Sequence, residues 1–421
     1  MALTTKTATG KIAAAAALGW LLMCGSLLAQ TKNSCLDCHA KLEDELKSPV
    51  TGFAGDVHAQ FGLGCADCHG GNPALDDEDK AKDKTFRGAP KRAQVPEFCA
   101  RCHADSAYIR NFNPRLRVDQ LELYRTSRHG QLLKKGDTRV AVCTDCHGVH
   151  GIQTAKHPKS LTFPWNIPQT CGRCHADAAR MKDYKIPTDQ LALYKESVHA
   201  QALFEKKDLS APACNSCHGN HGAAPPEVKS IAFVCRQCHP SAGELFSKSP
   251  HKKAFDDAGL SECEACHGKH KIVRPSDDML GTGKDAICVQ CHEAGSKPYA
   301  MAGRIHDLVV DFRGGIERDQ ALLEQAERKG VEVSDPKYKL QEIHTLLVTV
   351  RNLTHALDPA DLETKVAEGR TLLAGVQASG EAALREAKLR RAGLVVATAL
   401  LILFAFAFYL KIRQMRGKGG A

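Results

Sequence analysis

Nine copies of the pentapeptide Cys-x-x-Cys-His constrain this chain more than any other feature. The copies use every cysteine except Cys24, and all of them lie between Cys35 and His292. A disulfide framework does not need a fixed two-residue gap, and zinc ribbons do not need a histidine after every cysteine pair. The stretch that holds the motifs must therefore fold around groups bound at short intervals.

The chemistry of the pentapeptide predicts covalently bound haem. Two cysteines three positions apart reach the two vinyl groups at one edge of a haem and form thioethers, and the next residue supplies an imidazole to the iron. The sequence thus predicts nine haem c groups. The predicted thioether cysteines are Cys35, Cys38, Cys65, Cys68, Cys99, Cys102, Cys143, Cys146, Cys171, Cys174, Cys214, Cys217, Cys235, Cys238, Cys263, Cys266, Cys288 and Cys291. The predicted proximal iron ligands are His39, His69, His103, His147, His175, His218, His239, His267 and His292.

Eight of the nine motifs fall into four units of two. Each unit has an aromatic residue, Ser or Asp three positions later, a histidine two positions after that, then Cys-x-x-Cys-His-Gly and a second motif. In three units another histidine follows the first haem histidine by three positions, whereas the first unit has Asn72 there. This pattern predicts tandem dihaem modules with one extra haem at their start. The units open with Phe53/Asp56/His58, Tyr124/Ser127/His129, Tyr194/Ser197/His199 and Phe246/Ser249/His251.

A dihaem unit is too short to bury a core made of side chains alone. We therefore expect the porphyrins themselves to form the core of this region. The fold class that follows is mainly α with extensive loops and little sheet, in which tandem dihaem modules wrap around a haem array.

Histidines outside the motifs are candidates for the second axial ligand of each iron. Seven of them occupy repeated positions in the units, which predicts distal ligation. His157 and His306 lie outside the repeat, and with them the number of distal candidates equals the number of irons. The seven are His58, His129, His150, His199, His221, His251 and His270.

Other residues are weaker candidates for iron ligation. Met181, Met279 and Met301 are alternatives, and a methionine ligand would raise the potential of its haem. His344 and His355 stand eleven residues apart on a predicted helix and share a face that borders its apolar stripe. We expect these two histidines at the solvent edge.

Two imidazoles close the coordination sphere of an iron, so such an iron exchanges electrons but does not readily bind a substrate. None of the motifs has lysine in place of its histidine. This favours an electron carrier over a catalyst. The alternative is a terminal reductase for nitrite, hydroxylamine, tetrathionate or a metal, with one open iron at the motif of His39 or His103.

Two apolar segments flank the motif region. Lys6 and Lys11 followed by an apolar run predict a signal peptide over residues 1–29, and the alternative is an uncleaved N-terminal anchor. Near the other end, Gly393 to Leu410 is uncharged and spans about 27 Å as a helix, enough to cross the hydrocarbon core. The predicted domains are a signal peptide (1–29), a nonahaem domain (30–295), a helical bundle or stalk (296–391), a transmembrane helix (392–411) and a cytoplasmic tail (412–421).

The stretch after His292 lacks cysteine and has helical periodicity. Asp-Pro pairs at 335–336 and 358–359 predict an N-cap followed by proline at the first helical position, so three helices are expected. The last is expected to continue into the membrane span. The predicted buried positions are Ile305, Leu308, Val309, Phe312 and Ile316 in the first helix, Leu340, Ile343, Leu347 and Val350 in the second, and Leu362, Val366, Leu372, Leu373 and Val376 in the third.

The formal charge of +9 does not indicate a nucleic-acid partner. No Lys/Arg-rich run is interleaved with aromatic residues, and the haem propionates would offset most of the positive excess. We therefore expect no nucleic acid among the partners.

The motifs and the repeated histidines resemble those of bacterial multihaem c-type cytochromes with doubled Cys-x-x-Cys-His motifs, over residues 35–292. That group is related to cytochrome c3 and to membrane-bound quinol-dehydrogenase cytochromes. The resemblance implies bis-histidine haems and electron exchange between the membrane quinone pool and periplasmic or outer-surface redox proteins. The quinol dehydrogenases anchor through an N-terminal helix, whereas this chain also has a C-terminal span. The implied partners are therefore an integral-membrane quinone-interacting or cytochrome b subunit and a periplasmic redox protein, with the haem domain in the periplasm and the span in the bacterial inner membrane.

Overall fold

The computed structural model describes residues 33–43, 46–225 and 231–417, and every regular element in these ranges is a helix. The mainly α fold with extensive loops is therefore confirmed. The predicted signal peptide lies outside the described residues. Contacts divide the chain into two compact units. One contains the described residues up to Cys171 together with Asn220–Ala223, and the other contains Gly172–Gly219 and the chain from Ala224 onward.

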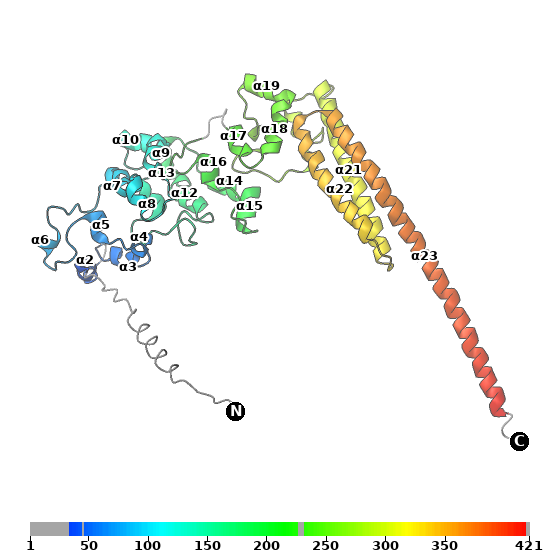
Figure 1. Ribbon diagram of the computed structural model, residues 1–421. Coiled ribbons are helices and arrows are strands. Elements are labelled where there is room, and N and C mark those ends of the chain that lie inside the picture. Colours follow the sequence, from blue (N-terminus) through cyan, green and yellow to red (C-terminus); the bar gives the residue numbers. More distant parts are fainter. Residues whose placement is uncertain (1–32, 44–45, 226–230, 418–421) are drawn as a thin grey trace, which may run out of the picture. The chain divides into compact units, whose positions relative to one another are not determined.

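The motif region consists of short helices joined by loops (Figure 1). Up to the end of the fourth motif they are α2 (Ser34–His39), α3 (Ser48–Phe53), α4 (Val57–Gln60), α5 (Cys65–His69), α6 (Glu78–Ala81), η2 (Arg92–Gln94), α7 (Val95–His103), α8 (Ser106–Arg110), α9 (Gln120–Thr126), α10 (Arg128–Lys134) and α11 (Cys143–His147). Beyond it they are α12 (Ile167–His175), α13 (Ala178–Met181), η3 (Lys182–Tyr184), α14 (Gln190–Lys195), α15 (Val198–Phe204), α16 (Cys214–His218), α17 (Ile231–Arg236), α18 (Pro240–Lys248), α19 (Pro250–Ala258), α20 (Glu264–His267), η5 (Asp277–Met279) and η6 (Cys288–Gln290).

The glycine after the first motif of each unit ends the motif helix directly behind the ligating histidine. All four glycines have positive φ, a conformation that glycine adopts at little cost. The chain can therefore leave the helix at once and carry the following loop away. These glycines are Gly70 (φ 73°), Gly148 (φ 85°), Gly219 (φ 78°) and Gly268 (φ 75°).

Hydrogen bonds explain the aromatic and hydroxyl residues that open the units. Ser127 accepts from the backbone N–H of Gly130 at 2.9 Å and thereby caps the helix that carries His129. The hydroxyl of Tyr124 donates to the carbonyl of Ala141 at 2.8 Å, two residues before the first cysteine of that unit. The third unit repeats both contacts. The hydroxyl of Ser197 accepts from the backbone N–H of Ala200 at 3.1 Å, and the hydroxyl of Tyr194 donates to the carbonyl of Pro212 at 2.9 Å.

The contiguous cluster of buried apolar side chains lies in the C-terminal bundle, beginning at Ile305. Buried apolar side chains in the motif region, such as Val142, Phe163 and Leu203, do not belong to this cluster. This distribution agrees with the expectation that bound groups supply the core of the motif region.

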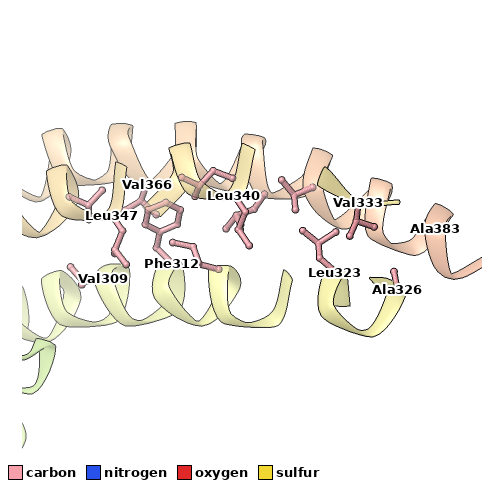
Figure 2. Close-up of a cluster of buried hydrophobic side chains, with 14 of the residues drawn as sticks. Val309, Phe312, Leu323, Ala326, Val333, Leu340, Leu347, Val366 and Ala383 are labelled. Carbon is pink, nitrogen blue, oxygen red and sulfur yellow. The ribbon is translucent and has the colours of Figure 1, made fainter. Parts of the chain in front are cut away.

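Three helices pack together to form the bundle (Figure 2). They are α21 (Lys297–Glu327), α22 (Ser334–Leu353) and α23 (Pro359–Gly417), with the short η7 (Thr354–Ala356) between the last two. The ring of Phe312 is fully buried, and Gly369 of α23 provides the space it occupies. All predicted core positions are buried except Leu308, which is partly buried, and Leu372, which is 45% exposed.

The first Asp-Pro pair does not start its helix as expected. Helix α22 begins one residue before Asp335, which lies in the first turn and is not the N-cap. Asp358 does precede α23, and its carboxylate accepts from the backbone N–H of Ala360 at 2.9 Å.

Helix α23 is continuous from the bundle into the apolar segment, as Figure 1 shows. Its most apolar window has a mean hydropathy of 2.5, and none of that window is buried in the protein. It is the one helix among the described residues that is long and apolar enough to cross a membrane. A single C-terminal span fits these properties.

Candidate haem centres

Seven pairs of imidazole rings each join a motif histidine to a histidine from elsewhere in the chain. Their ring centroids are separated by 5.7 to 6.4 Å. The pairs are His103 with His58 (6.0 Å), His69 with His150 (6.2 Å), His147 with His221 (6.1 Å), His239 with His199 (6.4 Å), His218 with His270 (6.0 Å), His292 with His251 (5.7 Å) and His267 with His355 (6.1 Å).

This spacing fits a metal ion held between two rings. Two metal–imidazole bonds of about 2 Å each, plus half a ring on either side, add up to roughly 6 Å between centroids. Two side-chain ligands leave the other positions around the metal to a planar group such as porphyrin. The residues therefore fit haem, with the thioether cysteines supplied by the same motifs.

The alternatives to haem lack support in the described part of the chain. None of the eighteen motif cysteines, all of which are described, takes part in a disulfide. No cluster of three or more His, Cys, Asp or Glu side chains that could hold a metal ion by themselves occurs among these residues. A zinc site built from protein ligands alone is thus not formed.

Burial keeps many of these rings in the neutral form that binds metal. The desolvation of a charged imidazolium lowers its pKa, and nearby imidazoles lower it further. The pKa is lowered in this way, with burial as the main cause, for His103, His147, His150, His175, His199, His221, His251, His267 and His270.

The pairs follow two rules of connection. First, the histidine that opens a unit faces the second motif histidine of the same unit, as His58 faces His103. Second, the histidine three positions after a unit's first motif faces the first motif histidine of the preceding unit, as His150 faces His69. The first rule also holds in the third and fourth units, and the second rule holds at each of the three junctions between units.

One backbone hydrogen bond recurs at the three junctions. At each junction the donor is the backbone N–H of the residue just before the histidine that opens a unit. The acceptor is the carbonyl two residues after the distal histidine that the next unit supplies. This contact brings the two distal-histidine segments of neighbouring units together. The bonds run from Val57 to Ile152 (2.7 Å), from Arg128 to Ala223 (3.0 Å) and from Val198 to Ile272 (2.9 Å).

In the first unit a buried carboxylate reinforces this junction. Asp56 is 2% exposed, and one of its oxygens accepts from both the backbone N–H and the ring Nδ1 of His58, each at 2.8 Å. Its other oxygen accepts from the backbone of Gly151 at 2.8 Å and of Ile152 at 2.7 Å, directly after His150. Asp56 therefore positions two candidate distal ligands at once.

Thiol contacts bring neighbouring units together on the cysteine side as well. The side chains of Cys99 and Cys143 lie next to each other, and so do those of Cys235 and Cys263. In both cases the second motif of one unit meets the first motif of the next. The haem edges attached at these cysteines would therefore be close neighbours.

Not all of the predicted distal ligands face a motif histidine. The ring of His157 is exposed, and its Nδ1 accepts from the backbone of Lys159 at 3.2 Å. His306 packs on Gly281, with Nδ1 3.1 Å from Asp307. In the ranges that the structure covers, neither ring faces a motif histidine. Their ligation stays a prediction.

His129 is the repeated distal candidate that is not among the seven pairs given above. By the first rule it belongs to the second motif of its own unit. This assignment rests on the sequence repeat and stays a prediction.

Two expectations about individual sites have to be corrected. His355 was expected at the solvent edge, but its half-buried ring faces that of His267. His103 was one of two candidates for an open iron, but its ring faces that of His58. Once the structure shows that each unit supplies a histidine to the preceding unit, the fourth unit is seen to need a ligand from outside the repeat, because no unit follows it.

Two protein-family models match parts of the chain. The family model described as Cytochrome c3 matches residues 57–175, which begin just before His58 and end at His175. The family model described as Doubled CXXCH motif matches residues 256–297 and encloses both motifs of the fourth unit. No curated protein sequence and no solved structure matches the chain significantly.

Proposed function

The chain is a multihaem c-type cytochrome, and from this premise we propose that it moves electrons along nine covalently bound haems. The electrons would pass between a quinone-linked donor or acceptor in the membrane and soluble or outer-surface redox partners. The single observation that carries the proposal is the set of seven facing imidazole pairs.

Haem iron supplies one-electron redox chemistry when bound, and its axial ligands decide whether it also binds substrate. A pair of facing imidazoles, such as His58 with His103, would hold the iron from both sides and leave no position for a substrate. The hydrogen bonds of Asp56 and the recurring junction bonds hold these rings in place, so little rearrangement would accompany a change of oxidation state. Rigid, closed sites of this kind support electron transfer rather than catalysis.

The contacts between neighbouring motifs support transfer from haem to haem. Electron hopping is fast only when cofactor edges lie close together. Cys99 lies next to Cys143 in one compact unit, and Cys235 lies next to Cys263 in the other. Haems attached at these cysteines would therefore have edges that lie close together.

The length of α23 supports a separate membrane partner. His355 lies just before the start of this helix at Pro359, and the apolar segment begins at Gly393. At 1.5 Å per residue these two points of the helix are roughly 50 Å apart. A quinone at the span would be too far from that haem for direct transfer. We therefore propose an integral-membrane quinone-interacting or cytochrome b subunit as partner, with the haem domain in the periplasm and the anchor in the bacterial inner membrane.

A second candidate function, that of a terminal reductase, centres on the motif of His39. By the second rule the residue three positions after His69 should face the haem that precedes the first unit, and that residue is Asn72. Pro73, the next residue, accepts a hydrogen bond from the backbone N–H of Ser34 at 2.9 Å, at the start of the helix that carries His39. An asparagine beside this motif would leave the iron open to a small ligand.

Spectroscopy of the purified full-length chain separates the two functions. The carrier predicts low-spin ferric haems by EPR and no carbon monoxide adduct after reduction by dithionite. The reductase predicts one carbon monoxide-binding haem and reoxidation by nitrite or hydroxylamine. Asn72→His should close that site and abolish the adduct, whereas the matched Asn72→Gln should keep it. Rapid turnover of nitrite or hydroxylamine that Asn72→His removes would overturn the carrier proposal.

A further inference from the structure

We propose that His355, a residue of the helical bundle, is the second axial ligand of the iron whose proximal ligand is His267. The inference rests on the proposed function, because it requires haem at the first motif of the fourth unit. It assigns to the bundle a role in completing a haem site, in addition to packing and anchoring.

The geometry of the two rings matches that of the other pairs. Their centroids are 6.1 Å apart and their planes are inclined by 25°. His355 thus stands in the same relation to His267 as the repeat histidines do to their partners.

A hydrogen bond prepares the ring of His355 for ligation. Its Nδ1 donates to the backbone carbonyl of Asn352 at 2.9 Å. A histidine that donates through one ring nitrogen presents the other as a neutral ligand, an arrangement common at metal sites. Nε2 is therefore the nitrogen left for iron.

Ion pairs fix the bundle onto the segment that follows His267. Asp277 of η5 is 5% exposed, and its two oxygens accept from the guanidinium of Arg351 at 2.8 Å each. Arg313 of α21 donates to the same carboxylate at 2.8 Å. Since Arg351 stands one helical turn before His355, this cluster fixes the position of His355 relative to the motif of His267.

A second contact holds the same end of α22, just before η7. The side-chain amide of Asn352 donates to the hydroxyl of Ser241 at 2.5 Å. Ser241 lies in the first turn of α18, directly after the second motif of the third unit. The end of α22 is thus tied both to η5, after the first motif of the fourth unit, and to α18, after the second motif of the third unit.

The repeat also indicates that the fourth unit needs a ligand from outside. Each earlier unit receives a histidine for its first haem from the following unit, at the junction with the recurring backbone hydrogen bond. In the fourth unit the residue at the donor position is Pro250, which has no N–H. The fourth unit therefore cannot form this junction. His355 faces His267 in the position that a histidine from a following unit would otherwise take.

The experiment uses the full-length protein in detergent and the substitution His355→Ala. We expect nine haems by intact mass, together with one additional high-spin ferric haem by EPR and one additional carbon monoxide-binding haem per chain relative to the wild type. Millimolar imidazole should restore the low-spin signal. His344→Ala is the matched control, since His344 lies on α22 of the same bundle and has no ring contact with a motif histidine among the described residues.

A second variant covers the case in which His355→Ala does not accumulate. His355→Met retains a ligand but replaces nitrogen by sulfur, so one haem of the nine should titrate at a higher potential while the others are unchanged. Unchanged spectra and potentials in both variants, or the same changes in His344→Ala, would overturn the assignment. A wild-type chain without covalent haem would instead overturn the proposed function itself.

Discussion

The ring of His58 donates through Nδ1 to the buried carboxylate of Asp56 at 2.8 Å, and the same carboxylate holds the backbone that follows His150. One side chain thus controls the distal side of two haem sites. The relationship explains why the first unit carries aspartate where the other units have serine. Serine offers one acceptor oxygen, whereas a carboxylate can accept from both segments.

Substitution of Asp56 should weaken both sites. Asp56→Ala leaves several N–H groups without an acceptor, which we expect to cost about 2 to 3 kcal/mol of unfolding free energy. It should also produce a high-spin fraction at the haems of His69 and His103. Guanidinium denaturation followed at the Soret band, together with EPR, measures both effects. Asp208→Ala is the control, because Asp208 is exposed and caps only its own loop. A spectrum and midpoint equal to the wild type would contradict the role given to Asp56.

The hydroxyls of Tyr124 and Tyr194 should matter less than their rings. Each donates one hydrogen bond to a carbonyl just before a motif, whereas the first and fourth units have phenylalanine at the same position. Tyr124→Phe should cost about 1 kcal/mol and leave the haem content unchanged. Tyr124→Ala should cost several times more, since it also removes the ring. Equal losses from the two variants in denaturation experiments would show that the hydroxyl alone stabilises the unit.

Packing in the bundle should depend on which glycine of α23 is replaced. A Cβ at Gly369 would lie 2.3 Å from the ring of Phe312, which is fully buried. Gly369→Ala should therefore destabilise the bundle by about 1 to 3 kcal/mol. At Gly375 a Cβ meets nothing within 4 Å, so Gly375→Ala should stabilise the helix by about 0.5 to 1 kcal/mol. Thermal unfolding followed by circular dichroism at 222 nm compares the two, and effects of the same sign would contradict this packing.

Asp319 should make the bundle less stable as the pH rises. Burial raises the pKa of its carboxyl above the usual range, Glu381 raises it further, and Arg318 opposes the shift. The folded state therefore binds the proton more tightly than the unfolded state, so the ionised carboxylate destabilises the fold at neutral pH and this effect fades in acid. Asp319→Asn should stabilise the bundle at pH 7, by on the order of 1 kcal/mol.

The same variant should show little gain once the wild-type carboxyl is protonated. Unfolding midpoints measured from neutral to acidic pH give the difference between the two proteins. A difference that grows toward low pH would have the wrong sign and would exclude the burial explanation.

The sequence repeat predicted the motif region well because each short segment has its own local cause. The repeated spacing identified the glycine after each first motif and the aromatic and Ser or Asp positions that open the units, and the structure supplied the caps and tyrosine contacts that these residues make. The helices of the bundle were equally predictable from their apolar period. Leu372 and Leu373 show the limit of that method, since both are apolar and only the second faces the core.

The partners of the distal histidines could not be inferred in the same way. Spacing shows that His150 is repeated but does not show that it faces His69 of the previous unit, because that depends on how units stack. His355 was missed for a related reason. It belongs to no repeat, and its role follows from the ion pairs of Asp277 that set the bundle against the fourth unit.

Intact-mass spectrometry of the purified full-length chain tests the central claim most directly. The account predicts a red protein whose polypeptide is heavier by nine haem groups that survive denaturation, one for each Cys-x-x-Cys-His motif. A colourless polypeptide that retains zinc or disulfides at these cysteines would contradict it.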